Sequence, residues 1–270
     1  MPANKYSLAD LLRVMQRLRD PLHGCPWDLA QDFRSIVPST LEECYELAHA
    51  IEHDDYPHVA EELGDVMFQV IFYAQLGSER DLFSFEDVVD TLVEKLLRRH
   101  PHVFLNGEIE GVVVAGSTVD QVRESWESIK QNERADRAQS GVLDDVPVAL
   151  PALPRAQKLQ KRAAGVGFDW LDAEGVLAKL EEEIGELREA IAAQAEDEIN
   201  AEMGDVLFSA VNLARHLGLD AEGSLRASSS KFETRFRSME AQAAGIGQSL
   251  ESLSAADLEA LWQRAKNELA

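Results

Sequence analysis

Glu42-Glu43-Cys44-Tyr45-Glu46, followed by Glu62-Leu63-Gly64-Asp65, is the stretch of this chain that occurs twice. The pattern returns 140 residues later, at 182–186 and 202–205. In each copy two acids three residues apart precede a second acidic pair with the same spacing. A constant offset across both pairs indicates an internal repeat, and the repeat predicts two related folding units.

The repeated acids predict a metal site in each copy. Residues three apart on a helix share a face, so each copy can present two pairs of carboxylates from two helices. Like charges this concentrated repel one another unless a cation lies between them. A hard divalent ion such as Mg²⁺ takes oxygen ligands of this kind. The two predicted sets are Glu43, Glu46, Glu62 and Asp65, and Glu183, Glu186, Glu202 and Asp205.

The repeat extends to cations and a tryptophan beyond the acids. Lys and Arg four residues apart share a helix face and suit phosphate oxygens. A Trp with a Lys four residues later adds a flat surface and a further cation. The offset is 136 residues here, and the pairs are Lys95 with Lys231, Arg99 with Arg235, Trp126 with Trp262, and Lys130 with Lys266.

Length and pattern predict an all-α protein of two tandem units. The chain has 270 residues and is 45% hydrophobic, and no long period-two alternation is present. Residues 131–155 become rich in proline and read as the connection. We therefore expect a first domain at 1–135, a connection at 136–155 and a second domain at 156–270.

Composition excludes several classes of protein. Acids outnumber Lys plus Arg by 49 to 26, which disfavours nucleic-acid binding through a basic face. Two cysteines are too few for a disulfide framework. The first ten residues lack a signal pattern, and no apolar run approaches a membrane span. A cytoplasmic protein that contacts neither nucleic acid nor membrane is the expectation.

Capping signals and apolar spacing place the helices. In the first unit we expect helices from Ser7, from Ser39 to about Glu52, from about Pro57 to Leu76, from Ser84 and from Thr118, with an irregular loop at 21–38. In the second unit we expect them at 173–193, 196–217, 221–243 and 255–268.

The constellation favours metal-assisted hydrolysis of a phosphoanhydride. Carboxylates can hold Mg²⁺, which keeps some water and accepts phosphate oxygens as further ligands. The Lys/Arg pairs would clamp phosphates, and the Trp offers a surface for stacking a base. No Walker A glycine loop is present, which argues against a P-loop mechanism.

The acidic repeat and its flanking runs resemble the MazG family of nucleoside triphosphate pyrophosphohydrolases. Besides the acids, the resemblance rests on Met15 to Asp20, Gly24 to Asp28, Arg98 to Phe104 and Val166 to Trp170. It covers almost the whole chain. It implies an all-α fold, Mg²⁺ dependence with Mn²⁺ as a substitute, a homodimer, and cleavage of NTP or dNTP to monophosphate and pyrophosphate. A role in nucleotide-pool housecleaning or regulation follows from it.

The resemblance also assigns residues, with the working site in the second copy. Glu183, Glu186, Glu202 and Asp205 would ligate Mg²⁺, and Glu182 would orient the attacking water. The chain departs from the family at Ala201, where an acid is common and where the first copy keeps Glu61. The nucleotide would be held by Lys179, Lys231, Arg235, Trp262, Lys266 and Lys130, with Lys95, Arg99 and Trp126 as first-copy equivalents.

Other interpretations of the same residues remain open. A protein that binds metal-nucleotide without turnover would carry the same groups. Glu46-x-x-His49 is typical of di-iron bundles, although the second copy has Glu189 at that position. Glu42 fits a capping box with Ser39, and the tryptophans fit core anchors. The Lys/Arg pairs fit helix-end cations, and Lys158, Lys161 and Arg162 fit a solvated face or a triphosphate contact.

Overall fold

The computed structural model describes residues 5–111, 116, 118–122, 125, 126, 129, 133 and 141–268. The all-α prediction is confirmed, since this part of the chain forms helices and no strand. None of its helices is long and apolar enough to cross a membrane. Contacts divide the chain into two compact units, Met1–Asn132 and Glu133–Ala270, each described separately below.

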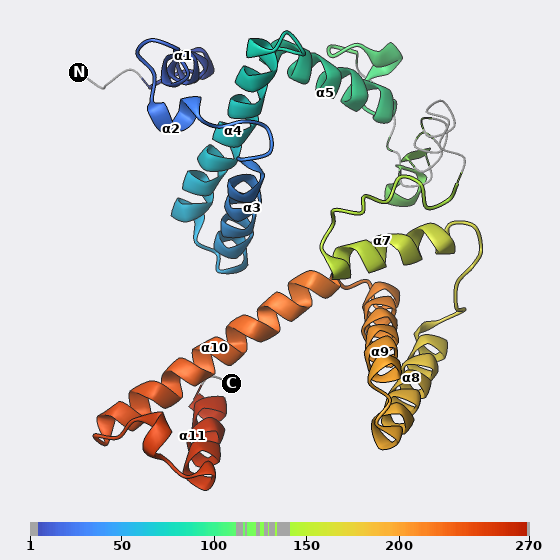
Figure 1. Cartoon of the computed structure of the whole chain (residues 1–270). Helices are drawn as coiled ribbons and strands as arrows, with labels where there is room; N and C mark the ends of the chain where they lie inside the picture. The colour runs from blue at the N-terminus through green and yellow to red at the C-terminus, as the bar shows by residue number, and fades with distance from the viewer. Residues whose placement is uncertain are drawn as a thin grey trace. The chain divides into compact units, whose positions relative to one another are not determined.

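The first unit is built around two long antiparallel helices (Figure 1). Helix α3 packs along α4, while α1 and α5 contact α4. Its core joins Met15 of α1 to Ile71, Phe72 and Leu76 of α4. The elements are α1 (Leu8–Leu18), α2 (Pro26–Leu29), α3 (Val37–Glu52), α4 (Tyr56–Glu79), α5 (Phe85–Arg99) and the 3₁₀ turn η1 (Leu105–Gly107).

The second unit repeats this plan. Helices α8 and α9 form the long pair, and α7 packs on α9 as α1 packs on α4. Helix α10 leads away from that pair and carries α11 on its C-terminal half (Figure 1). The elements are α7 (Ala152–Ala164), α8 (Ala173–Ala193), α9 (Glu196–His216), α10 (Ala221–Gly245), the 3₁₀ turn η2 (Leu250–Ser252) and α11 (Ala255–Glu268).

Two predicted helix starts are confirmed by their caps. Ser7 and Asp10 form a reciprocal capping box at α1, with Asp10 Oδ2 accepting from the Ser7 amide at 2.9 Å. Ser84 and Asp87 repeat it at α5, with a distance of 2.7 Å. Each box satisfies amide groups that have no partner inside the helix. The helix predicted from Thr118 falls partly outside the described residues.

In two places the prediction was wrong because prolines were interpreted as signs of a loop. The expected loop at 21–38 contains α2, and α3 begins at Val37, so Ser39 lies inside α3 and caps nothing. The expected connection ends in α7, with Pro151 at the N-cap and Pro154 in the first turn. Proline fits a first turn because the amides there have no helical acceptor. The prolines therefore mark helix starts.

Candidate metal centre

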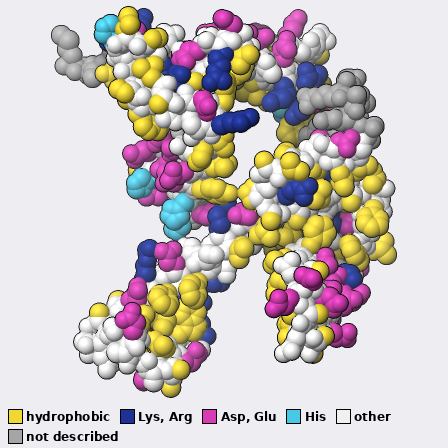
Figure 2. Space-filling view, viewed as in Figure 1, with side chains coloured by type: hydrophobic (Ala, Val, Ile, Leu, Met, Phe, Trp, Pro, Cys, Tyr) yellow, Lys and Arg dark blue, Asp and Glu magenta, His cyan; other side chains and the backbone are white. Residues whose placement is uncertain are grey.

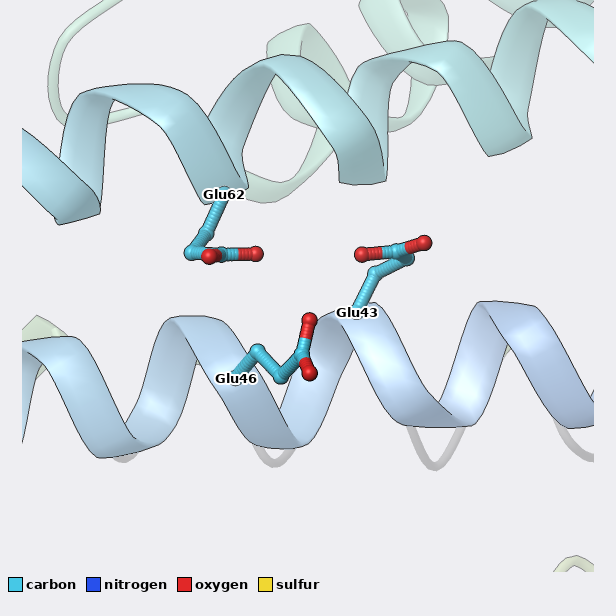
Figure 3. Close-up of side chains that lie close together, drawn as sticks. All are labelled: Glu43, Glu46 and Glu62. Atoms are coloured by element: carbon cyan, nitrogen blue, oxygen red, sulfur yellow. The ribbon is translucent and has the colours of Figure 1, made fainter.

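Three carboxylates of the first unit meet between its two long helices. Glu43 and Glu46 project from α3 toward Glu62 of α4, as Figure 3 shows. One oxygen from each lies within 4.8 Å of the others. The spacing of three puts the first two on one helix face, and the packing of α3 on α4 brings in the third. The Oε2 atom of Glu62 is buried and has no hydrogen-bond partner, which fits a cation bound at this point.

The second unit repeats the arrangement. Glu183 and Glu186 of α8 and Glu202 of α9 also present oxygens within 4.8 Å of one another. Glu183 is only 6% exposed. Carboxylates alone make up both sets among the described residues, and oxygen ligands of this kind suit Mg²⁺ or Mn²⁺. His49 belongs to neither set, which disfavours the di-iron interpretation.

Figure 2 shows acidic side chains gathered over α8 and α9 and over the α3–α4 pair. Burial, then the charges of Asp65 and Glu46, raise the pKa of Glu43. Burial and the charge of Glu46 likewise raise the pKa of Glu62. In the second unit a hydrogen bond with Glu183 raises the pKa of Glu186 most. Burial and the neighbouring negative charges both disfavour the ionised carboxylates, and a bound divalent cation would offset both effects.

The fourth predicted ligand of each copy lies outside the group of three carboxylates. Asp65 and Asp205 are exposed and fall outside the sets within 4.8 Å. Asp65 is still close enough for its charge to raise the pKa of Glu43. The structure therefore brings together three of the four predicted ligands in each copy.

Lys179 lies directly on the second acidic set. Its ammonium group is 2.8 Å from Glu182 Oε1 and 2.8 Å from Glu183 Oε1. The hydrogen bonds that Lys179 donates to these two carboxylates raise its pKa. Glu182, predicted to orient water, is mostly exposed and is held by this lysine. The predicted nucleotide ligand Lys179 is thus an ion-pair partner of the acids.

The other predicted nucleotide ligands of the second copy lie on α10 and α11. Lys231 is exposed on α10, and among the described residues it forms no ion pair or hydrogen bond with the acids of α8 and α9. Arg235 is half-buried, and its Nε has no hydrogen-bond partner. Trp262 packs on Phe232 with ring centroids 5.4 Å apart and flanks the α10–α11 core. Lys266 is half-buried on α11.

In the first copy the equivalent groups lie around the end of α5. Lys95 and Arg99 are half-buried on that helix. Trp126 donates its indole N–H to the Arg99 carbonyl at 2.8 Å and meets His100 edge-on. Lys130 lies outside the described residues.

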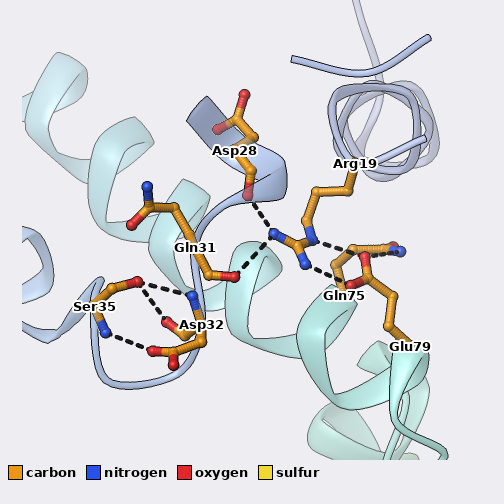
Figure 4. A network of polar contacts seen from close by, with 7 residues as sticks. All are labelled: Arg19, Asp28, Gln31, Asp32, Ser35, Gln75 and Glu79. Carbon is orange, nitrogen blue, oxygen red and sulfur yellow. Dashed lines mark hydrogen bonds and ion pairs between the residues drawn. The ribbon is translucent and has the colours of Figure 1, made fainter. Parts of the chain in front are cut away.

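Sequence reasoning missed the polar groups that fix the loop before each helix pair. In the first unit Arg19 donates two hydrogen bonds to Glu79 of α4, at 2.7 and 2.6 Å, and others to the Asp28 and Gln31 carbonyls (Figure 4). Gln75 donates to Glu79 at 3.0 Å. The sequence did indicate these groups, because Arg19 and Asp28 lie in the runs that carry the family resemblance.

The second unit makes the same connection with the charges exchanged. Asp169, in the loop before α8, accepts from Arg215 and lies 2.9 Å from His216 Nε2, both at the end of α9. The bond from Arg215, helped by His216 and opposed by burial, lowers the pKa of Asp169 to about 2. Each unit thus ties its loop to one of the helices that carry the acids.

Comparison with known proteins places both acidic stretches in one family. A model of the MazG nucleotide pyrophosphohydrolase domain matches residues 31–104 and 172–239. The "Nucleoside triphosphate pyrophosphohydrolase" of Escherichia coli (strain K12) is 47% identical over 262 residues, 96% of each chain. The "Nucleoside triphosphate pyrophosphohydrolase/pyrophosphatase MazG" of Thermotoga maritima is 43% identical over 95% of this chain and 94% of its own. The uncharacterized protein YabN of Bacillus subtilis is 41% identical over 94% of this chain and 50% of its own.

Proposed function

Since the chain belongs to the MazG nucleotide pyrophosphohydrolase family, we propose that it is a hydrolase that cleaves nucleoside triphosphates to monophosphate and pyrophosphate with Mg²⁺. The observation that carries the proposal is the pair of all-carboxylate sets, one with an orphaned Glu62 oxygen and one with a buried Glu183. Mn²⁺ fits the same oxygen ligands.

Each group of the second copy has a role in this reaction. Glu183, Glu186 and Glu202 hold the metal, with Asp205 one turn further along α9. When bound, the ion neutralises charge on phosphate oxygens and lowers the pKa of a coordinated water. Glu182 orients the water that attacks the α-phosphorus, and pyrophosphate leaves.

The cations and the tryptophan bind the nucleotide. Lys231 and Arg235 are four residues apart on α10, and the unpartnered Nε of Arg235 is available to a phosphate oxygen. Trp262 and Lys266 are four residues apart on α11; the tryptophan supplies a surface on which a base can stack, and the lysine supplies a further cation. Lys95, Arg99, Trp126 and Lys130 are the equivalents in the first copy, and turnover takes place in the second copy.

Two carboxylates decide the test. Glu183→Gln together with Glu186→Gln should lower pyrophosphate release from NTPs with Mg²⁺ by at least about 100-fold, because both side chains stay but their charges go. The matched control is Glu181→Gln with Glu189→Gln, exposed acids of the same helix outside the set. Undiminished release in the first variant would refute the assignment.

A panel of NTPs and dNTPs, scored for pyrophosphate against orthophosphate, separates this reaction from phosphatase activity. No pyrophosphate release from any substrate of the panel, with metal-nucleotide still bound, would favour a regulatory binding protein.

The cellular role we propose is housecleaning or regulation of the nucleotide pool in the cytoplasm. We also propose a homodimer, supported by apolar side chains that α4 and α9 leave exposed at equivalent positions.

A further inference from the structure

The two acidic sets differ at one position. Lys179 lies four residues before Glu183 on α8, and the position 140 residues earlier, four before Glu43 on α3, is Ser39. Positions four apart lie on the same helix face. One set therefore has a built-in cation beside it, and the other has a neutral hydroxyl.

The lysine is in contact with the least accessible ligand of its set. Its ammonium is 2.8 Å from Glu183, whose side chain is 8% exposed. Among the described residues no Lys, Arg or His forms an ion pair with Glu43, Glu46 or Glu62. His58, whose charge acts on Glu62, is itself paired with Asp55 at 2.6 Å.

A divalent ion and an ammonium group compete for the same carboxylate. Metal bound at Glu183 must either break the ion pair with Lys179 or accept a positive charge a few ångströms away, and both weaken binding. Resting on the function proposed above, we infer that Lys179 is an internal counter-cation that makes the second set bind divalent metal more weakly than the first.

The substrate changes this competition. A triphosphate is a new anionic partner for the ammonium that the metal displaces, so metal and nucleotide bind cooperatively in the second copy. Among the described residues the first set has no ammonium group to displace, so it holds its metal without nucleotide. Position 179 thus determines whether metal arrives before the substrate or with it.

The test is Mn²⁺ binding to the full chain without nucleotide, monitored by electron paramagnetic resonance. Glu183→Gln/Glu186→Gln isolates the first set, and Glu43→Gln/Glu46→Gln isolates the second. We expect the first set to bind Mn²⁺ about tenfold more tightly, as loss of one partly buried charge contact predicts.

Exchanging the two residues should exchange the affinities. Lys179→Ser should tighten the second set about tenfold, and Ser39→Lys should weaken the first by a similar factor. Lys179→Met, which keeps an apolar stem, should act like Lys179→Ser, whereas Lys179→Arg should preserve the weak binding. Circular dichroism of the metal-free variants verifies folding.

A non-hydrolysable triphosphate with a methylene bridge between the α- and β-phosphorus should tighten Mn²⁺ at the second set, and Lys179→Ser should reduce that gain. Equal affinities of both sets in the starting protein, unchanged by Lys179→Ser, would overturn the inference while leaving the proposed function intact. Absence of Mn²⁺ binding at both sets would instead overturn the proposed function.

Discussion

At the scale of residues, Glu43 shows how the acidic sets lower the stability of the metal-free protein. Burial first, then Asp65 and Glu46, raise the pKa of Glu43, so the ionised form is disfavoured in the folded state relative to the unfolded one. We expect Glu43→Gln to raise the thermal midpoint in EDTA at pH 7 by about 1–2 °C. The gain should shrink as the pH falls through the raised pKa, because the original carboxyl is then protonated too.

Added Mg²⁺ should reverse that order. The starting protein gains stability from a ligand that binds only its folded state, and the variant has lost a ligand for the ion. Differential scanning fluorimetry with EDTA and with Mg²⁺ measures both effects. A Glu43→Gln variant that melts below the starting protein in EDTA would contradict the repulsion inferred here.

Residue spacing predicted which acids share a face, but it could not predict which atoms meet. Glu43, Glu46 and Glu62 gather as expected, while Asp65 lies to the side, because helix periodicity gives a direction and packing gives a distance. Lys179 was expected to contact substrate and is found on Glu183. An ion pair four residues apart is visible in sequence, but its geometry depends on rotamers.

At the scale of elements, Asp169 fixes the loop before α8 to the end of α9. Asp169→Asn removes the charge that Arg215 and His216 hold, and we expect a loss of about 1–3 kcal/mol in the free energy of unfolding at pH 7. Because bonds from Arg215 and His216 lower the folded-state pKa to about 2, this stabilisation is complete above the ordinary value near 3.8. It fades as the pH falls from about 4 toward 2.

Urea unfolding at pH 7, 5 and 3 measures this difference, with Glu181→Gln as a control for an exposed acid of α8. A gap between Asp169→Asn and the starting protein that stays constant down to pH 3 would show that charge is not the cause. If Asp169→Asn is as stable as the starting protein at pH 7, then the contacts of Asp169 with Arg215 and His216 do not stabilise the fold.

Elements with clear caps and apolar periodicity were predicted closely, as α8 and α11 show at 173–193 and 255–268. Helices α2 and α7 were missed because their prolines resemble loop signals. The distinction depends on whether the amide that proline lacks would have had a partner, and that depends on where the helix begins. Sequence alone does not fix that point where no side-chain cap is present, as at Val37.

At the scale of the whole molecule, the repeat places exposed apolar side chains at equivalent positions beside both acidic sets. Leu63 and Met67 of α4 are 50% and 47% exposed, and Met203 and Leu207 of α9 are 45% and 53% exposed. Each pair is four residues apart and forms a stripe on its helix. Because this apolar surface occurs in both units, it favours an interface in which a second copy of the chain buries it.

The proposed homodimer should therefore depend on the α9 stripe, Met203 and Leu207. Burying a Met or Leu contributes about 1.5–3 kcal/mol, and two-fold symmetry counts each substitution twice, so Met203→Glu with Leu207→Glu should weaken dimerisation by at least about 100-fold. Analytical ultracentrifugation over a concentration series measures the change. Val166→Glu with Leu171→Glu, at exposed apolar loop positions, adds the same charge and should leave the dimer intact. A monomeric starting protein, or a dimer that withstands both glutamates on α9, would show that the stripe serves another purpose.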